Sequence, residues 1–369
     1  KIAGLDAMQA HFRETLDAEL EIIDLRRESV IFENGVIVSR RALPGDPLGY
    51  RAVDLGRKSF FEGSGLDPSK MRGADYDPGP TSEHHSNGRN AYLLSETVLS
   101  CDLIINLPKL KTHKKTGVTL ALKNMVGING DKNWLPHHCA GSVEVGGDEF
   151  PGIALIDRVR SRLTEWGRAL LGRNLAKGLI KAYRRAELKT RGDDFIRAGN
   201  WHGNRTTWRM CGDLNRCLYY SDKDGLHLDA EAPVRRVLTV LDAVVAGDMN
   251  GPLATRDVPL GAILASLDPI ALDLAAVRLM GFDETRIPKI REIMASTTLR
   301  VTAVRESGDV EIAESGSRAE NAPESLRVYA LDELECPRPF TPHPGWLNHI
   351  EKRADKDLGP SPTPEEVIA

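Results

Sequence analysis

The region from 234 to 282 places the strongest limit on the fold. An apolar segment at 234–245, a polar stretch GDMNGPLATRDVP and a second apolar segment ending at Ser266 indicate a strand, a loop and a strand. The apolar run that follows opens with Asp268-Pro269, and these residues suit the N-cap and the first turn of a helix. Two strands followed closely by a helix predict an α/β fold.

Four other segments add elements to this fold. The run EIIDLRRESVIFENGVIVSR predicts two strands joined through Asn34-Gly35, a common signal for a tight hairpin. CDLIINL at 101–107 predicts a buried strand of a parallel sheet, because such strands are short, apolar runs. Helical spacing of apolar residues predicts a long helix or a helical hairpin at 154–186 and a second helix at 206–221. We therefore expect an α/β protein with a mixed, mostly parallel sheet flanked by helices, an N-terminal hairpin and a long helical insertion.

Shorter stretches complete the expected elements. Gly, Pro, Asp and Ser dominate 56–90, which predicts a long loop. The segment 92–99 predicts a short helix, and VTLALKNMV at 118–126 fits a helix or a strand equally well. Two short strands are expected at 308–313 and 326–329.

The length of 369 residues fits one large α/β domain or two smaller units. We expect a single domain at 1–354, with the alternative of two lobes at 1–150 and 234–335 separated by a helical insertion at 151–232. The segment 355–369 is polar and contains proline, so it is predicted to be a flexible tail. The sequence leaves the oligomeric state open.

Charge and composition exclude several classes of function. A net charge of -4 and a pI near 6.2 argue against a nucleic-acid-binding protein. The apolar runs are far shorter than the roughly 20 residues that cross a bilayer, so we expect no membrane insertion and a cytoplasmic location. The scattered cysteines show no CxxC spacing, which disfavours disulfides and an iron–sulfur cluster. They are Cys101, Cys139, Cys211, Cys217 and Cys336.

The segment NLPKLKTHKKTGVTLALKNMVGINGDKNWLPHH at 106–138 concentrates positive charge directly after the expected strand at 101–107. Ligands of open α/β sheets bind beyond the carboxyl ends of strands, so we expect an anion site here. His113 and Lys123 are the expected catalytic residues, because an unperturbed histidine titrates near neutrality and a lysine in an apolar segment needs a partner or a ligand. Lys114 and Lys115 fit a solvated loop instead. The expected ligand-binding residues are Lys109, Lys111, Asn124 and Lys132.

Two further stretches contain candidate site residues. Asp242 lies near the end of an apolar strand and is the third expected catalytic residue, while the loop after it is expected to face the ligand through Asp248 and Asn250. The stretch GNWHGNRTTW combines aromatic faces with hydrogen-bond donors, a composition that suits a polar, sugar-like ligand. Its expected binding residues are Trp201, His202, Asn204 and Arg205.

A metal site is a weaker expectation. Adjacent histidines cannot easily point at one ion, and the chain has no HxH or HExxH spacing, so several loops would have to converge. A divalent metal and the identity of any cofactor therefore stay open. The candidate ligands are His84, His85, His137, His138, Asp148 and Glu149.

Two classes of function remain. The first is an enzyme that acts on an anionic small molecule, phosphorylated or carboxylated, such as a sugar or nucleotide-sugar derivative, with His113 as acid and base. The second is a non-catalytic binding or scaffold protein for an anionic glycan or an acidic segment of a partner. A bond from His113 to an acid such as Asp242 would favour catalysis, whereas lysines spread over an open groove would favour binding. No P-loop, GxGxxG or GxSxG motif adds a nucleotide site or a nucleophile.

The three most distinctive stretches, 106–138, GNWHGNRTTWRMCGDLNR and 240–282, resemble the family known as domain of unknown function 362 over roughly 98–290. The resemblance implies no activity. Some relatives carry a ferredoxin segment, but this chain lacks clustered cysteines, so the resemblance implies no iron–sulfur cluster here. KTHKKTGVTLALKNMVG is also similar to a stretch of nickel-pincer lactate racemases, which implies roles for His113 and Lys123 and a racemase or epimerase as the alternative activity. The other catalytic histidine of those racemases has no clear counterpart.

Overall fold

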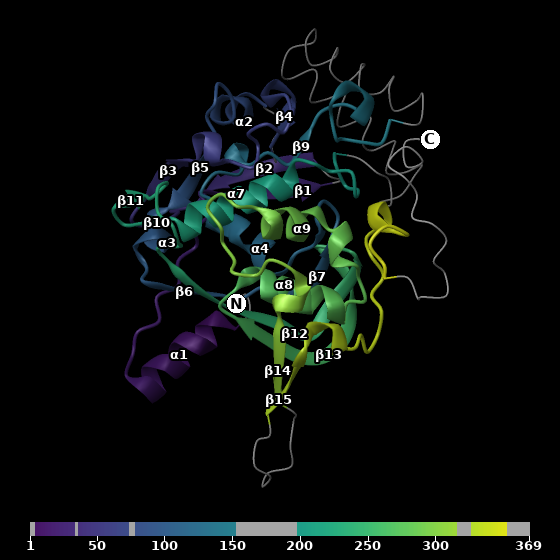
Figure 1. Ribbon diagram of the computed structural model, residues 1–369. Coiled ribbons are helices and arrows are strands. Elements are labelled where there is room, and N and C mark those ends of the chain that lie inside the picture. Colours follow the sequence, from purple (N-terminus) through teal and green to yellow (C-terminus); the bar gives the residue numbers. More distant parts are fainter. Residues whose placement is uncertain (1–3, 34–35, 74–77, 153–197, 316–325, 353–369) are drawn as a thin grey trace.

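The computed structural model describes residues 4–33, 36–73, 78–152, 198–315 and 326–352 (Figure 1). It confirms the α/β class. The largest sheet is mixed, because β12 pairs in parallel with β6 and β7 and antiparallel with β13, while β7 pairs antiparallel with β8. Its strands are β6 (Leu103–Asn106), β7 (Lys109–His113), β8 (Gly117–Val118), β12 (Arg236–Asn250) and β13 (Ala254–Ser266).

Helices cover one face of this sheet, and in Figure 1 they lie above it as a layer. α8 packs on β13 and on α4, while α7 packs on α4 and α9. Leu110 of β7 and Leu274 of α8 belong to the same buried core. The helices are α4 (Leu120–Asn124), α7 (Thr207–Tyr219), α8 (Pro269–Leu279) and α9 (Pro288–Ala295).

The opposite face of the sheet is open, which corrects one expectation. The segment 101–107 is a strand, as predicted, but Leu103 and Ile105 of β6 are exposed. Their neighbour Ile104 packs against the core. An apolar strand is typical of a sheet covered on both faces, yet the described residues of the chain cover one.

The unit at 234–282 forms the elements predicted for it, with a shorter loop. β12 continues to Asn250 and β13 begins at Ala254, so most of the expected loop is strand. Polar side chains are tolerated there because the outer face of this hairpin meets solvent. The helix prediction is confirmed, since Asp268 accepts hydrogen bonds from the backbone N–H groups of Ile270 (2.9 Å) and Ala271 (3.1 Å) at the start of α8.

The N-terminal hairpin is confirmed as β1 (Glu28–Glu33) paired with β2 (Val36–Ala42), although its first strand begins later than predicted. It follows α1 (Leu5–Leu16), a helix without a buried residue. Near the other end of the chain, β14 (Glu311–Ser315) and β15 (Leu326–Ala330) form the two predicted strands as an antiparallel hairpin.

Two of the remaining expectations need correction. The segment 92–99 is half strand, because β5 (Ala91–Ser95) pairs with β3 (Tyr50–Asp54) before α3 (Glu96–Ser100) begins. The long loop expected at 56–90 contains a short helix and a short strand. Other short elements are α2 (Gly79–His84), β4 (Met71–Arg72), β9 (His138–Cys139), β10 (Ser221–Asp222) and β11 (Gly225–Leu226).

The ambiguous segment 118–126 forms the helix α4 directly after β8. Of the helical insertion predicted at 151–232, α7 is confirmed, while the long helix at 154–186 lies outside the described residues, as does the tail at 355–369. None of the described helices is long and apolar enough to cross a membrane.

Candidate functional site

β7 ends in a tightly packed corner that fixes the basic loop. The backbone N–H of Lys114 donates a hydrogen bond to the carbonyl of Gly251 (3.2 Å). A Cβ on Gly251 would lie 1.9 Å from the carbonyl oxygen of Thr112, so this turn requires glycine. The end of the β12 strand therefore holds the start of the basic loop in place, as expected for a site at a strand end.

His113, the last residue of β7, is buried and neutral. Burial lowers the pKa of its imidazole well below the usual value, and the charges of Lys123 and Lys115 lower this pKa further. The backbone N–H of Lys115 donates to His113 Nδ1 at 3.1 Å. Nδ1 is therefore an acceptor, and the neutral ring carries its hydrogen on Nε2.

His137 is neutral for the same reasons but has the opposite tautomer. Burial lowers the pKa of His137 to about 3, with further contributions from Lys115 and Lys123. Its Nδ1 lies 2.8 Å from the carbonyl oxygen of Leu135, which can only accept, so Nδ1 is the donor. The free nitrogen, Nε2, therefore carries a lone pair. The charges of Lys115 and Lys123 lower the pKa values of both His113 and His137, and we group the two rings on that basis.

Lys115 is less solvated than the sequence suggested. Burial lowers the pKa of Lys115 to about 7, and the neighbouring Lys114 lowers this pKa as well, although Asp148 and Glu149 act in the opposite direction. Its Nζ donates a hydrogen bond to the backbone carbonyl of Ala198. The prediction of a solvated loop lysine is wrong here, because later segments of the chain cover the side chain.

Lys111 and Lys123 complete the group. Both are half-buried, and burial lowers the pKa of each ammonium. Within the part of the chain that the structure describes, neither side chain has a hydrogen-bond or ion-pair partner. The ammonium of Lys111 further lowers the pKa of Lys123, which places the two near each other. We call the group the lysine–histidine cluster; it comprises Lys111, His113, Lys115, Lys123 and His137.

A buried ion pair supports the helix that carries Lys123. Lys289 of α9 and Asp273 of α8 lie 3.1 Å apart, and both side chains are fully buried. Lys289 Nζ donates to the carbonyl of Thr119 (2.7 Å), and Asp273 accepts from the backbone N–H of Ala121 (2.7 Å). The pair therefore fixes the first turn of α4. Its role was missed, since nothing in the local sequence marks either residue as a neighbour of α4.

Several other predicted residues lie apart from the cluster. Asp242 binds Lys109 at 2.7 Å in an exposed pair, and its hydrogen bond to Lys109 lowers the pKa of Asp242. A hydrogen bond between His113 and Asp242 would have favoured catalysis, but the described contacts of His113 do not include one. Lys132 binds Glu28 of the N-terminal hairpin at 2.8 Å. Asn124 is exposed.

The loop after Asp242 has a structural role. Asp248 is buried and accepts two hydrogen bonds from Arg256, at Nε (3.0 Å) and Nη2 (2.6 Å), and one from the backbone N–H of Thr341 (2.9 Å). Its carboxylate is thus occupied by the protein. Asn250 is half-buried at the end of β12, next to Gly251 in the corner that holds the basic loop.

The stretch 201–205 supports the cluster from behind. Asn204 Nδ2 donates to the carbonyl of His137 (3.0 Å) and so holds the backbone of that histidine. Trp201 is buried, and its indole N–H donates to the carbonyl of Asp148 (3.0 Å). The backbone N–H of Arg205 donates to the Asp148 carboxylate (2.8 Å), while His202 stacks on His349. These contacts lie within the protein and hold the backbone near His137 and Asp148. The stretch therefore has a supporting role, in place of the open sugar-binding surface that its composition suggests.

The predicted metal ligands do not come together. His84 stacks on Trp134, and His85 Nε2 lies 2.8 Å from the carbonyl oxygen of the same tryptophan. Asp148 accepts from the backbone N–H of Cys139 (2.6 Å), in the strand that contains His138, and Glu149 accepts from a backbone N–H at 3.1 Å. Among the described residues, no three His, Cys, Asp or Glu side chains could hold a metal ion together.

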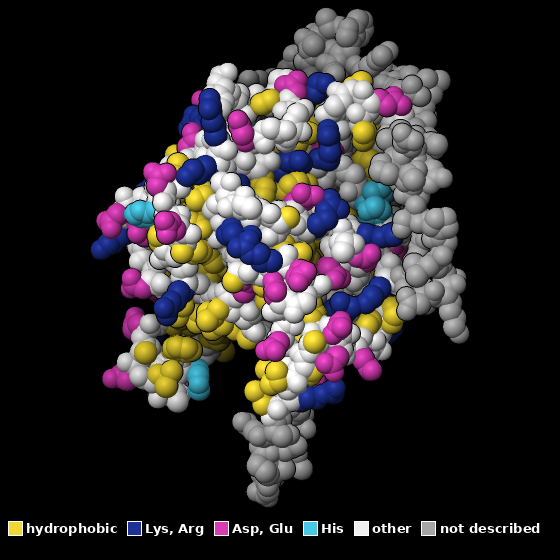
Figure 2. Space-filling view, viewed as in Figure 1, with side chains coloured by type: hydrophobic (Ala, Val, Ile, Leu, Met, Phe, Trp, Pro, Cys, Tyr) yellow, Lys and Arg dark blue, Asp and Glu magenta, His cyan; other side chains and the backbone are white. Residues whose placement is uncertain are grey.

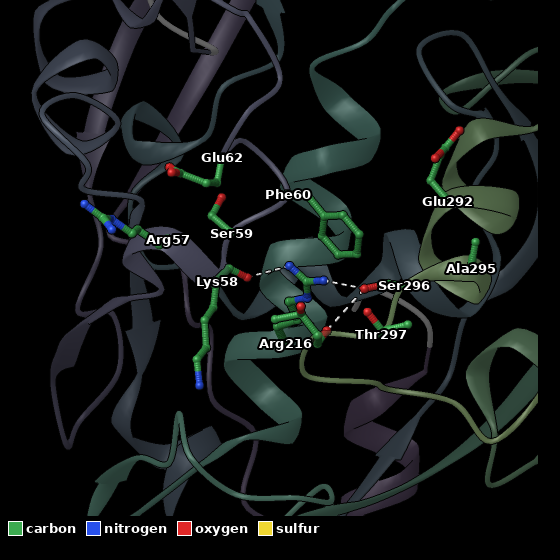
Figure 3. A pocket seen from close by; sticks show the side chains of 11 residues that line it. Arg57, Lys58, Ser59, Phe60, Glu62, Arg216, Glu292, Ala295, Ser296 and Thr297 are labelled. Carbon is green, nitrogen blue, oxygen red and sulfur yellow. Dashed lines mark hydrogen bonds between the residues drawn. The ribbon is translucent and has the colours of Figure 1, made fainter.

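A separate pocket of about 440 Å³ lies between the 57–62 segment and the end of α9 (Figure 3). Arg216 lines it and donates hydrogen bonds to the carbonyl of Lys58 and to Ser296 Oγ. Glu62 and Glu292 also line the pocket, so acids offset much of its positive charge. None of the predicted site residues lies there, and the lysine–histidine cluster remains the better candidate.

The comparisons with known proteins identify a family. No curated protein and no solved structure gives a significant match. The sequence model described as "Domain of unknown function (DUF362)" matches residues 36–278, which is more than half of the chain and includes the whole described cluster. The suggested likeness to nickel-pincer racemases finds no support in these comparisons. The chain belongs to the DUF362 family.

Proposed function

We propose that the lysine–histidine cluster is the active site of an enzyme that acts on a phosphorylated or carboxylated small molecule. The observation that carries the proposal is the pair of half-buried ammonium groups, Lys111 and Lys123, without a partner among the described residues. A desolvated cation without a counter-ion is costly. An anionic ligand would supply the missing counter-charge and would raise the lowered pKa values.

The two histidines would divide the proton chemistry. His137 offers a lone pair on Nε2 and would accept a proton, whereas the neutral His113 offers an N–H on Nε2 and would donate a hydrogen bond to the ligand. This assignment extends the role expected for His113 and gives His137 a role other than metal binding. Bound negative charge would raise both histidine pKa values toward the range in which proton transfer is efficient.

The site would prefer the protonated form of Lys115 when the ligand is bound. With a pKa of about 7, Lys115 is only partly protonated near neutral pH. Anion binding would therefore be coupled to proton uptake, and the affinity would increase as the pH falls from 8.5 to 6.5.

The first test is calorimetric titration with inorganic phosphate, pyrophosphate and citrate at two pH values. Replacing Lys123 with alanine should weaken binding about 10- to 100-fold, because a charge-assisted hydrogen bond contributes about 1.5–3 kcal/mol. Lys132→Ala is the matched control, since Lys132 is paired with Glu28 outside the cluster. Equal affinity of wild type and Lys123→Ala for all three anions would contradict the proposal.

A racemase or epimerase is the second candidate, favoured by the opposite tautomers of His113 and His137 in one cationic site. Such an enzyme would remove a proton from the carbon next to a carboxylate and return it. Incubation of 2-hydroxy acids in deuterated water, followed by proton NMR, would detect the exchange. His137→Gln should abolish it, with Lys132→Ala as the control. Tight anion binding without turnover of any candidate substrate would instead favour the non-catalytic binding protein.

A further inference from the structure

One face of the largest sheet carries hydrophobic side chains that no described element covers. Side chains alternate along β6, β12 and β13, so one set packs against the helices and the other points away from them. Ile104 lies in the first set, whereas Leu103 and Ile105 are 55% and 56% exposed. We call the second set the open sheet face; it comprises Leu103, Ile105, Leu107, Val244, Ile263 and Leu267.

The strand register joins these residues into one patch. Ile105 of β6 lies beside Leu238 of β12, and Ile263 of β13 lies beside Asp242 of β12. Residues paired across strands point to the same side of a sheet, so the patch extends over three strands. Contiguous hydrophobic patches on a protein surface often mark a binding site. The apolar sequence of β6, typical of a strand covered on both faces, also indicates a missing partner.

Two elements beside this face lack packing of their own. α1 has 12 residues and none is buried, and the contacts of β14 are mainly with β15. An isolated helix of this length and an isolated two-stranded hairpin are marginal in water. Both extend downward from the sheet in Figure 1, on the side away from the helix layer, and Figure 2 shows hydrophobic side chains on α1 and open space between α1 and the hairpin.

We propose that the open sheet face binds the same face of a second copy of this chain, in a two-fold symmetric dimer. In such a dimer one rotation covers both open faces and closes the assembly. The face carries the ion pair of Lys109 with Asp242 and, opposite Leu103, the exposed Arg236, so a two-fold arrangement can bring Arg236 of one copy to Asp242 of the other. α1 and the β14–β15 hairpin of each copy gain a surface to pack against.

The same pair disfavours an anionic lipid surface as the partner. Asp242 would face the lipid phosphates, and the ion pair would lose part of its hydration without gaining a counter-charge. A second copy supplies both charges, so the dimer is the better fit to this face.

The test is sedimentation velocity on the full chain over 1–50 micromolar, together with circular dichroism to verify folding. Wild type should sediment with twice the mass of the chain, and Ile105→Asp and Ile263→Asp should sediment as monomers. Both side chains are largely exposed, so these changes should leave the fold intact. Leu48→Asp is the matched control, because Leu48 is 62% exposed but lies in the loop before β3, and it should remain a dimer.

Hydrogen exchange of wild type provides a second measurement that needs no variant. Peptides of β6 and β13 should exchange faster on dilution below the dimer dissociation constant, while peptides of α8 should not change. Monomeric wild type over the whole concentration range would overturn the proposal, as would dimers that survive both aspartate substitutions. Monomeric wild type that floats with phosphatidylserine vesicles, and loses this ability in Ile105→Asp, would assign the face to a membrane surface instead.

Discussion

The lysine–histidine cluster and the N-terminal hairpin both contain basic side chains, yet the two regions differ in how positive charge is balanced. Glu28 of the hairpin binds Arg40 of the same hairpin and Lys132 of a later segment, and these contacts lower the pKa of the Glu28 carboxyl. In the cluster, Lys111 and Lys123 have no such partner among the described residues, and burial lowers their pKa values. The hairpin arrangement is typical of a folded surface. The cluster leaves an electrostatic cost that a ligand could remove.

A third arrangement sharpens this comparison, because Lys289 is even more buried than the cluster lysines but has a carboxylate. Asp273 lies 3.1 Å from its ammonium, and backbone carbonyls accept its other protons. Burial alone therefore does not distinguish a ligand site from a structural pair. What distinguishes Lys111 and Lys123 is desolvation without a counter-ion among the residues that the structure describes.

The largest expected effect comes from breaking that structural pair. Asp273→Ala leaves the Lys289 ammonium buried without a carboxylate, and such a loss costs about 3–5 kcal/mol of stability. The free energy of unfolding, measured by urea denaturation, should fall by this amount. The double variant Asp273→Leu with Lys289→Met should recover much of it, because no charge is left buried. A loss below about 1 kcal/mol in Asp273→Ala would show that the pair is more hydrated than its burial indicates.

The next effect is a pH dependence that the cluster should have and the hairpin should lack. The pKa of Lys115 is about 7 in the folded chain and about 10.4 in an unfolded one. Between these values the unfolded chain binds more protons, so Lys115 makes the free energy of unfolding rise with pH, with a slope of at most about 1.4 kcal/mol per pH unit. The buried Lys115 ammonium therefore destabilises the folded protein most strongly below pH 7, and this destabilisation disappears as the pH rises toward 10.

The contribution of Lys115 to this pH dependence can be measured by comparing wild type with variants that lack a single lysine. The difference in the free energy of unfolding between wild type and Lys115→Met should change with pH from 7 to 10. The same difference for Lys132→Met should stay flat over this range. Parallel curves for wild type and Lys115→Met would show that the Lys115 ammonium is solvated, and would restore the solvated loop that the sequence favours.

The sequence predicts the fold better than it predicts the environment of each side chain. Periodicity and the Asp268-Pro269 cap predict α8 and the strands before it, because these signals are local. The exposure of Ile105 could not be predicted, since it depends on which elements the chain places over each face of the sheet.

The candidate site shows the same division. The run of basic residues predicts an anion site, and the structure groups three of its residues, His113, Lys111 and Lys123, in the lysine–histidine cluster. The sequence favours other roles for Lys115 and His137, because their burial comes from segments far away in the sequence, such as the one that contains Ala198. Asp242 pairs with Lys109 through strand register, which local sequence does not determine.

The smallest expected effect separates the cluster from the hairpin most directly. The free energy of unfolding should change in opposite directions when a lysine of each region is replaced by methionine. Lys132→Met removes one partner of a partly exposed ion pair and should lower the free energy of unfolding by about 0–1 kcal/mol. Lys123→Met removes an ammonium whose pKa is lowered by burial, and so should raise the free energy of unfolding of the ligand-free protein at pH 7. Urea denaturation of both variants in buffer without phosphate measures the two changes. Added phosphate should reverse the order for Lys123, since wild type binds the anion more tightly than the variant and gains more stability from it. If both variants lose stability equally, with and without phosphate, then the Lys123 ammonium has a counter-charge in the folded protein. The cluster and the hairpin would then balance their positive charge in the same way.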